Sequence, residues 1–148
     1  MAYSGTFSPR HADKYLGDVR RVFYRSLWER RVMKYCDETP GVLKWSSEEI
    51  IVPYVSPVDG QTHRYFPDFY LEVAASGGGV KKFVIEVKPK SQVAEPVRRK
   101  KTRKFLKEVM TYSVNQAKWD AATKYAKSRG WEFIVITEDH LFGRGKTR

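Results

Sequence analysis

The sequence has a single cysteine, Cys36, and only three histidines. One cysteine cannot form an internal disulfide or a thiolate metal site, which excludes a disulfide-stapled domain and a zinc ribbon. The histidines, His11, His63 and His140, are scattered and lack metal-ligand spacing, which disfavours a zinc hydrolase. The sparse cysteine usage predicts a reducing, cytoplasmic setting.

Long apolar runs are also missing. No segment approaches the roughly 18 apolar residues of a membrane span, and the N-terminus has no signal-peptide core. With 148 residues, of which 41% are hydrophobic and 30% charged, the chain has the size and composition of one folded domain. We therefore expect a small soluble protein with no membrane partner.

Acidic residues are scarce beside basic ones, 17 against 28, which gives a net charge of +11. Such a surplus favours a polyanionic partner, because phosphate contacts do not depend on base sequence. Seven basic residues and no acidic one fall within 98–107 (RRKKTRKFLK), leaving +4 for the rest of the chain. We predict that this tract binds DNA, with a merely solvated helix face as the alternative. The predicted DNA contacts are Arg98, Arg99, Lys100, Lys101, Arg103 and Lys104.

The patterning along the chain predicts an α/β protein. Ser26 and Glu29 have the S-x-x-E spacing of a capping box, so we expect a helix from Ser26 to the Pro40-Gly41 break. Short apolar or alternating segments predict strands at 49–55, 64–73, 82–88 and 131–137.

Residues 98–111 and 115–129 predict two helices before the last strand. The order helix, three strands, two helices, strand predicts an α/β sandwich around a mixed central sheet. Residues 1–22 show no sustained period, so we expect an N-terminal arm followed by one domain at 23–148.

Three side chains in the middle of the chain carry the candidate chemistry. Asp68 follows Pro67, and Glu86 and Lys88 lie two apart on the following predicted strand. Residues i and i+2 of a strand share a face, so the carboxylate and the ammonium of this pair emerge side by side. Because apolar residues flank Glu86, its carboxylate needs Lys88, a metal ion or both. The alternatives are a solvated Asp68 at a strand start and a surface ion pair.

Metal-assisted phosphodiester hydrolysis suits this set of residues. Mg²⁺ prefers oxygen ligands and is held by one or two carboxylates, waters and phosphate oxygens, and Mn²⁺ can substitute for it. We predict that Asp68 and Glu86 bind the ion, together with the backbone carbonyl of Val87. Lys88 would orient the attacking water or stabilise transition-state charge. Glu29 would complete the site or bind a second ion, although its capping role alone would account for it.

The pair Pro67-Asp68 followed by Glu86-Val87-Lys88 resembles the motif of the PD-(D/E)xK nuclease superfamily. The expected element order is similar to the αβββαβ core of that superfamily, with Glu29 matching the helical glutamate that many members add. Longer segments resemble the head-completion nucleases of T-even-like phages, and a similar pattern occurs in TnsA-type transposon endonucleases. These segments are 1–5, 24–29, 52–54, 64–68, 85–90, 111–115 and 136–139.

The resemblance implies a restriction-endonuclease-like fold and a Mg²⁺-dependent endonuclease that acts on DNA in a newly filled phage head. It also implies head or portal proteins as partners, and the host cytoplasm or the virion as the location. Two alternatives remain open. One is a non-catalytic DNA-binding assembly protein that kept the fold, and the other is an enzyme that cuts junctions or transposon ends.

Overall fold

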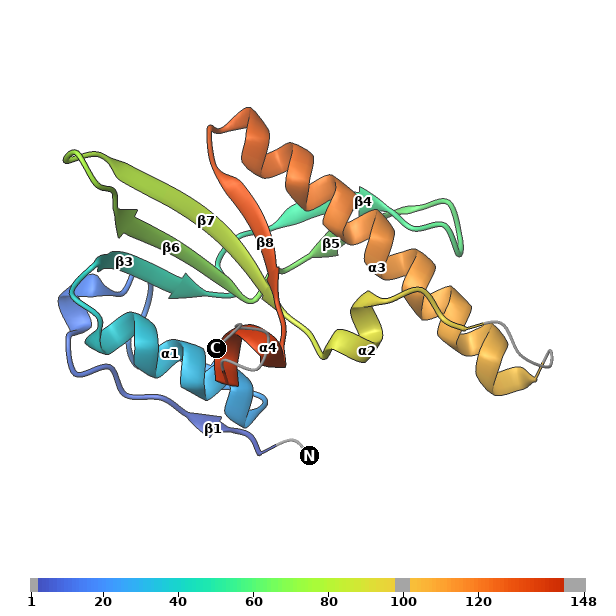
Figure 1. Ribbon diagram of the computed structural model, residues 1–148, viewed down its shortest axis with the longest axis horizontal. Coiled ribbons are helices and arrows are strands. Elements are labelled where there is room, and N and C mark those ends of the chain that lie inside the picture. The colour runs from blue at the N-terminus through green and yellow to red at the C-terminus, as the bar shows by residue number, and fades with distance from the viewer. Residues whose placement is uncertain (1–2, 98–101, 143–148) are drawn as a thin grey trace.

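The computed structural model describes residues 3–97 and 102–142, and its centre is a four-stranded sheet (Figure 1). Its strands, in spatial order, are β3 (Val42–Ser47), β6 (Phe69–Ala74), β7 (Val80–Val87) and β8 (Glu132–Ile136). β6 is antiparallel to both of its neighbours, β3 and β7, whereas β8 runs parallel to β7. The mixed α/β architecture predicted from the sequence is confirmed.

Two helices cover opposite faces of this sheet. α1 (Leu27–Glu38) begins after the N-cap Ser26 and buries Val32, Met33 and Cys36 at helical spacing. These side chains share a core with Phe69 and Ile85 of the sheet. α3 (Arg103–Ser128) packs on the other face, where a second core contains Trp119, Ala122 and partly buried side chains of β8. Alternation along β8 places Ile136 in the first core and Phe133 and Val135 in the second.

The first predicted strand is confirmed at residues 52–55, but its predicted place in the central sheet was wrong. The antiparallel partner of β6 is β3, which the sequence analysis left unassigned, and residues 49–55 do not belong to the central sheet. Instead β4 (Val52–Val55) pairs with β5 (Thr62–Tyr65) in a separate hairpin. The predicted strand at 64–73 is divided between β5 and β6 because Pro67, which lacks an N–H donor, falls between them.

The two predicted helices after β7 were also wrong in number, because residues 103–128 form the single helix α3. Thr102 caps it, and its Oγ1 accepts a hydrogen bond of 3.1 Å from the N–H of Phe105. Residues 98–101 of the predicted basic helix lie outside the described residues. The first half of α3 is solvent-exposed and extends past the sheet, whereas the second half packs against it (Figure 1).

The segment before α1 lies against the same core as that helix. β1 (Gly5–Thr6) pairs with β2 (Phe23–Tyr24), and the short helix η1 (Ala12–Lys14) lies between them in sequence. Phe7, Tyr15 and Val22 are buried in the α1 core. The N-terminal residues therefore contribute hydrophobic contacts to the domain.

Two further short helices follow the ends of β7 and β8 (Figure 1). They are α2 (Lys90–Val93) and α4 (Glu138–Phe142). In the described part of the chain, no helix is both long enough and apolar enough to span a bilayer.

Candidate active site

The two carboxylates predicted to bind metal lie together where β7 ends. Asp68 immediately precedes β6, and its Oδ2 accepts a hydrogen bond of 2.8 Å from the N–H of Val87. Glu86 is the penultimate residue of β7, and its Oε1 accepts a 2.6 Å hydrogen bond from the hydroxyl of Tyr65. Both are buried, with Asp68 8% and Glu86 6% exposed. The fold thus brings two carboxylates from adjacent strands into one buried site.

Lys88 lies beside Glu86, as the spacing of two residues on a strand predicts. Its Nζ is 3.5 Å from Oε2 of Glu86, and its side chain is 29% exposed. Its backbone N–H donates a 2.9 Å hydrogen bond to the carbonyl oxygen of Ile136. The ammonium therefore reaches both the buried carboxylate and solvent, at the point where β7 and β8 end together.

The electrostatics of the site show excess negative charge. Burial raises the pKa of Asp68 to about 8, with the neighbouring charge of Glu86 as the next cause. Burial also raises the pKa of Glu86, although the hydrogen bond from Tyr65 and the charge of Lys88 oppose this. Two desolvated carboxylates with raised pKa values favour uptake of a cation, either a proton or a metal ion.

The donor set fits a magnesium ion. Within the described ranges, no three Asp, Glu, His or Cys side chains converge closely enough to hold a metal ion. Mg²⁺ does not require such a cage, because it keeps several waters and takes one or two carboxylates together with substrate phosphate. Asp68 and Glu86 would supply those carboxylates. The Val87 carbonyl remains a prediction as a further ligand.

The surroundings of Glu29 are compatible with both of its candidate roles, helix capping and membership of the metal site. Its N–H donates a 3.2 Å hydrogen bond to Oγ of Ser26. Its Oε1 accepts a 3.0 Å hydrogen bond from the N–H of Arg25, one residue before the N-cap, rather than from Ser26 as in a capping box. Its negative charge also contributes to the raised pKa of Asp68. Glu29 is therefore a helix-end residue within electrostatic reach of the site.

Several residues at the site were missed by the sequence analysis. Tyr65 holds Glu86, and Nζ of Lys118 on α3 lies 5.6 Å from the centre of the Tyr65 ring. Arg25 forms an ion pair with Glu48, whose N–H donates a 3.1 Å hydrogen bond to the carbonyl oxygen of Asp68. No local sequence motif marks these residues as part of the site. The hairpin, α3 and the end of β3 reach the site only in the folded chain.

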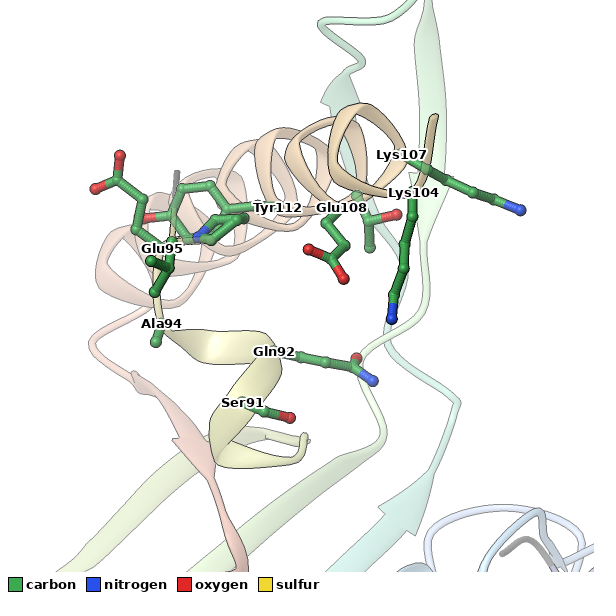
Figure 2. A pocket seen from close by; sticks show the side chains of 11 residues that line it. Ser91, Gln92, Ala94, Glu95, Lys104, Lys107, Glu108 and Tyr112 are labelled. Carbon is green, nitrogen blue, oxygen red and sulfur yellow. The ribbon is translucent and has the colours of Figure 1, made fainter. Parts of the chain in front are cut away.

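A groove of about 680 Å³ opens between α2 and the first half of α3 (Figure 2). Lys104 and Glu108 of α3 and Gln92 of α2 are directed toward this space. α2 begins two residues after Lys88, so the groove follows the carboxylate site along the chain.

The predicted DNA contacts are only partly described by the structure. Arg103 and Lys104 lie exposed in the first turn of α3, and Lys104 lines the groove. Arg98, Arg99, Lys100 and Lys101 lie outside the described residues.

Comparisons with known proteins point to nucleases. Residues 39–138 match the family model described as the TnsA-like endonuclease N terminal domain. The chain is also 36% identical over 150 residues to the head completion nuclease of Enterobacteria phage T4, covering 98% of this chain and 97% of that protein. No solved structure matches significantly. The family match contains Asp68, Glu86 and Lys88 but begins after Glu29.

Proposed function

The chain belongs to the TnsA-like endonuclease family and is a nuclease, and we propose that it hydrolyses DNA phosphodiester bonds with a bound divalent metal ion. The observation that carries this proposal is the pair of buried carboxylates, Asp68 and Glu86, with raised pKa values beside the ammonium of Lys88. Within the described residues, Lys88 is the only ammonium that forms an ion pair with either carboxylate, and the charge of Lys118 also acts on Glu86. A structural ion pair with Glu86 would leave the buried Asp68 unexplained. Burial of a surplus negative charge is costly unless the site serves a cation.

Each residue has a distinct proposed role. Asp68 and Glu86 hold the ion, with the Val87 carbonyl as a third ligand and Glu29 as the fourth member of the site. When bound, Mg²⁺ or Mn²⁺ lowers the pKa of a water molecule and offsets charge on the phosphate. Lys88 orients the attacking water or stabilises the developing charge. Tyr65 fixes the orientation of the Glu86 carboxylate through the 2.6 Å hydrogen bond.

The biological setting is proposed from the relative. The T4 protein is named a head completion nuclease, and the two chains align over almost their full lengths. We propose that this chain also acts in head completion, on the DNA of a filled phage head. Head or portal proteins would be its partners, in the infected cell or on the virion. The net charge of +11 supports the DNA contact in that setting.

A plasmid-nicking assay tests the catalytic proposal. Purified protein is incubated with supercoiled plasmid in Mg²⁺, in Mn²⁺ and in EDTA. We expect nicked and linear products with either metal ion and none in EDTA. Asp68→Asn should abolish cleavage and leave DNA binding intact, whereas Asp120→Asn, which changes an exposed carboxylate on α3, should cleave like the wild type. DNA binding without cleavage by the wild-type protein would instead indicate a non-catalytic assembly protein.

A further inference from the structure

We propose that Arg25 is a further substrate-binding residue of the active site, which Glu48 positions to contact the phosphate that is cleaved. This inference rests on the proposed nuclease function. Arg25 is the last residue before the N-cap of α1, and Glu48 directly follows β3. Neither belongs to the carboxylate and lysine set predicted from the sequence, and both reach it through tertiary contacts.

Arg25 is tied to the site at two points and remains open to solvent. Its backbone N–H donates the 3.0 Å hydrogen bond to Oε1 of Glu29. Its guanidinium Nη2 forms the ion pair with Oε2 of Glu48, and the Arg25 side chain is 63% exposed. A guanidinium carries five N–H donors, so the pair with Glu48 leaves donors for a ligand from solvent.

Glu48 combines an unusual backbone conformation with a hydrogen bond to the proposed site. Its φ is 57°, and it is the one non-glycine residue with positive φ in the described part of the chain. This region is unfavourable for a side chain with a Cβ, and such strain persists where the surrounding structure enforces it. The Glu48 N–H donates a 3.1 Å hydrogen bond to the Asp68 carbonyl oxygen, directly after the pairing of Ser47 with Phe69. The carboxylate that holds Arg25 is thereby fixed to the backbone of a proposed metal ligand.

The charges around Arg25 explain why it lies at this position. Partial burial of the guanidinium acts to lower its pKa, but the negative charges of Glu48, Glu29 and Asp68 outweigh this and raise it. Arg25 is thus a cation among carboxylates of the site. The guanidinium fork matches phosphate oxygens. A phosphate bound to the ion that Asp68 and Glu86 are proposed to hold would come within the same cluster.

A purely structural role accounts less well for these observations. An exposed ion pair contributes little to stability, because solvent and salt screen it. The pair of Arg25 and Glu48 is more than half exposed on the arginine side, yet its carboxylate belongs to a residue with a strained backbone. Strained residues of this kind cluster at sites that bind or transform ligands. Phosphate binding by Arg25 would account for a strained residue at this position.

Salt-dependent DNA binding tests the proposal. Affinity for a short duplex is measured in Ca²⁺ at several salt concentrations, and a denaturing gel verifies that the strands stay intact. We expect Arg25→Ala to weaken binding and to reduce the slope of log K against log salt by about 0.9, the value for one phosphate that is no longer neutralised. The control Arg129→Ala removes the same charge at the far end of α3, where the guanidinium stacks 3.6 Å from the Tyr125 ring centre, and should keep the wild-type slope.

Cleavage and rescue variants complete the test. With Mg²⁺ and saturating plasmid, Arg25→Ala should cleave roughly 100-fold more slowly than the wild type, as when one charged group that stabilises a transition state is removed. Arg25→Lys should restore the salt slope but only part of the rate, because an ammonium cannot bind phosphate in a bidentate manner. Glu48→Gln should lower the rate with an unchanged melting temperature.

An unchanged salt slope in Arg25→Ala would overturn the proposal, whatever its melting temperature, and would leave Arg25 as a structural partner of Glu29. The proposed function has its own readout, which is cleavage by the wild-type protein in Mg²⁺. If the wild type does not cleave, the nuclease proposal fails, and the slope in Ca²⁺ still decides whether Arg25 contacts phosphate.

Discussion

Glu29 occupies a position where helix capping and catalysis require different chemistry. As a helix-end residue it needs only an oxygen that accepts the hydrogen bond from the Arg25 N–H. As a member of a metal site it needs a negative charge next to Asp68. The two requirements separate when the charge is removed and the oxygen is kept.

We therefore expect Glu29→Gln to retain thermal stability and to lose most of the cleavage activity. Glu29→Ala should lose activity too, and should also lose about 1–2 kcal/mol of stability with the hydrogen bond to Arg25. Thermal melts and plasmid nicking on the same preparations measure both quantities. Wild-type cleavage by the Gln variant would reduce the proposed site to Asp68, Glu86 and Lys88.

At the residue scale, the sequence predicted the part of the site that is local. Glu86 and Lys88 lie on one strand, so their spacing alone places them side by side. Their proximity to Asp68 follows from antiparallel pairing of consecutive strands. Tyr65 and Glu48 could not be found in this way. Tyr65 belongs to the separate β4–β5 hairpin, and Glu48 follows β3 with a positive φ that no local pattern indicates.

At the scale of elements, α3 has a packed half that contributes to the core and an exposed half that begins with basic residues. Its second half buries Trp119 and Ala122 against β4, β5 and β8. Its first half is exposed, begins with Arg103 and Lys104, and forms one side of the groove next to α2 (Figure 2). Because the helix is continuous, the packed half sets the direction of the basic half.

The basic half of α3 should contribute phosphate contacts. We expect the double variant Arg103→Ala/Lys104→Ala to bind all duplex sequences more weakly and to reduce the salt slope by about 0.9 for each phosphate that the protein no longer neutralises. The matched control is Lys124→Ala/Lys127→Ala, which removes two exposed charges from the packed half of the same helix. Equal slopes in the two double variants would leave the solvated-helix interpretation in place.

The errors in element assignment have physical causes. β3 (VLKWSS) begins directly after Pro40-Gly41 and contains a lysine and two serines, so its sequence does not indicate a strand. The segment is a strand because it pairs with β6 and because Trp45 is fully buried. Thr111, Ser113 and Asn115 have low helix propensity, which favours a break at this point of α3. Tertiary packing outweighs this local preference, since Asn115 and Trp119, one helical turn later, are both buried.

At the scale of the whole molecule, we expect the stability of the fold to depend on protons and on the proposed metal ion. Asp68 and Glu86 are buried at the end of a sheet with a core on each face. A carboxyl group with a raised pKa in the folded state binds its proton more tightly than it does in the unfolded chain. The associated stability is fully present below the unfolded pKa and is lost as pH rises through the folded pKa.

For Asp68 this window extends from its ordinary pKa of 3.8 to about 8. Metal-free wild type should therefore lose stability relative to Asp68→Asn as pH rises through this range, by about 1–3 kcal/mol at pH 8.5. Mg²⁺ should raise the melting temperature of the wild type but not of the variant, and calorimetry in two buffers should show proton release on binding. A pH-independent difference between the two proteins would contradict the raised pKa.

The parallel pairing of β7 with β8 has a consequence for the order in which the protein becomes active. Glu86 and Lys88 are synthesised well before residues 132–136, which close the outer edge of their strand and accept the Lys88 N–H at Ile136. A ribosome-bound chain that ends before β8 already contains Glu29, Asp68, Glu86 and Lys88, but β7 then has an unpaired edge. The end of β7 that carries Glu86 and Lys88 is therefore fixed only after β8 has been translated, so a growing chain holds all four proposed site residues before the strand that bears two of them is paired on both edges.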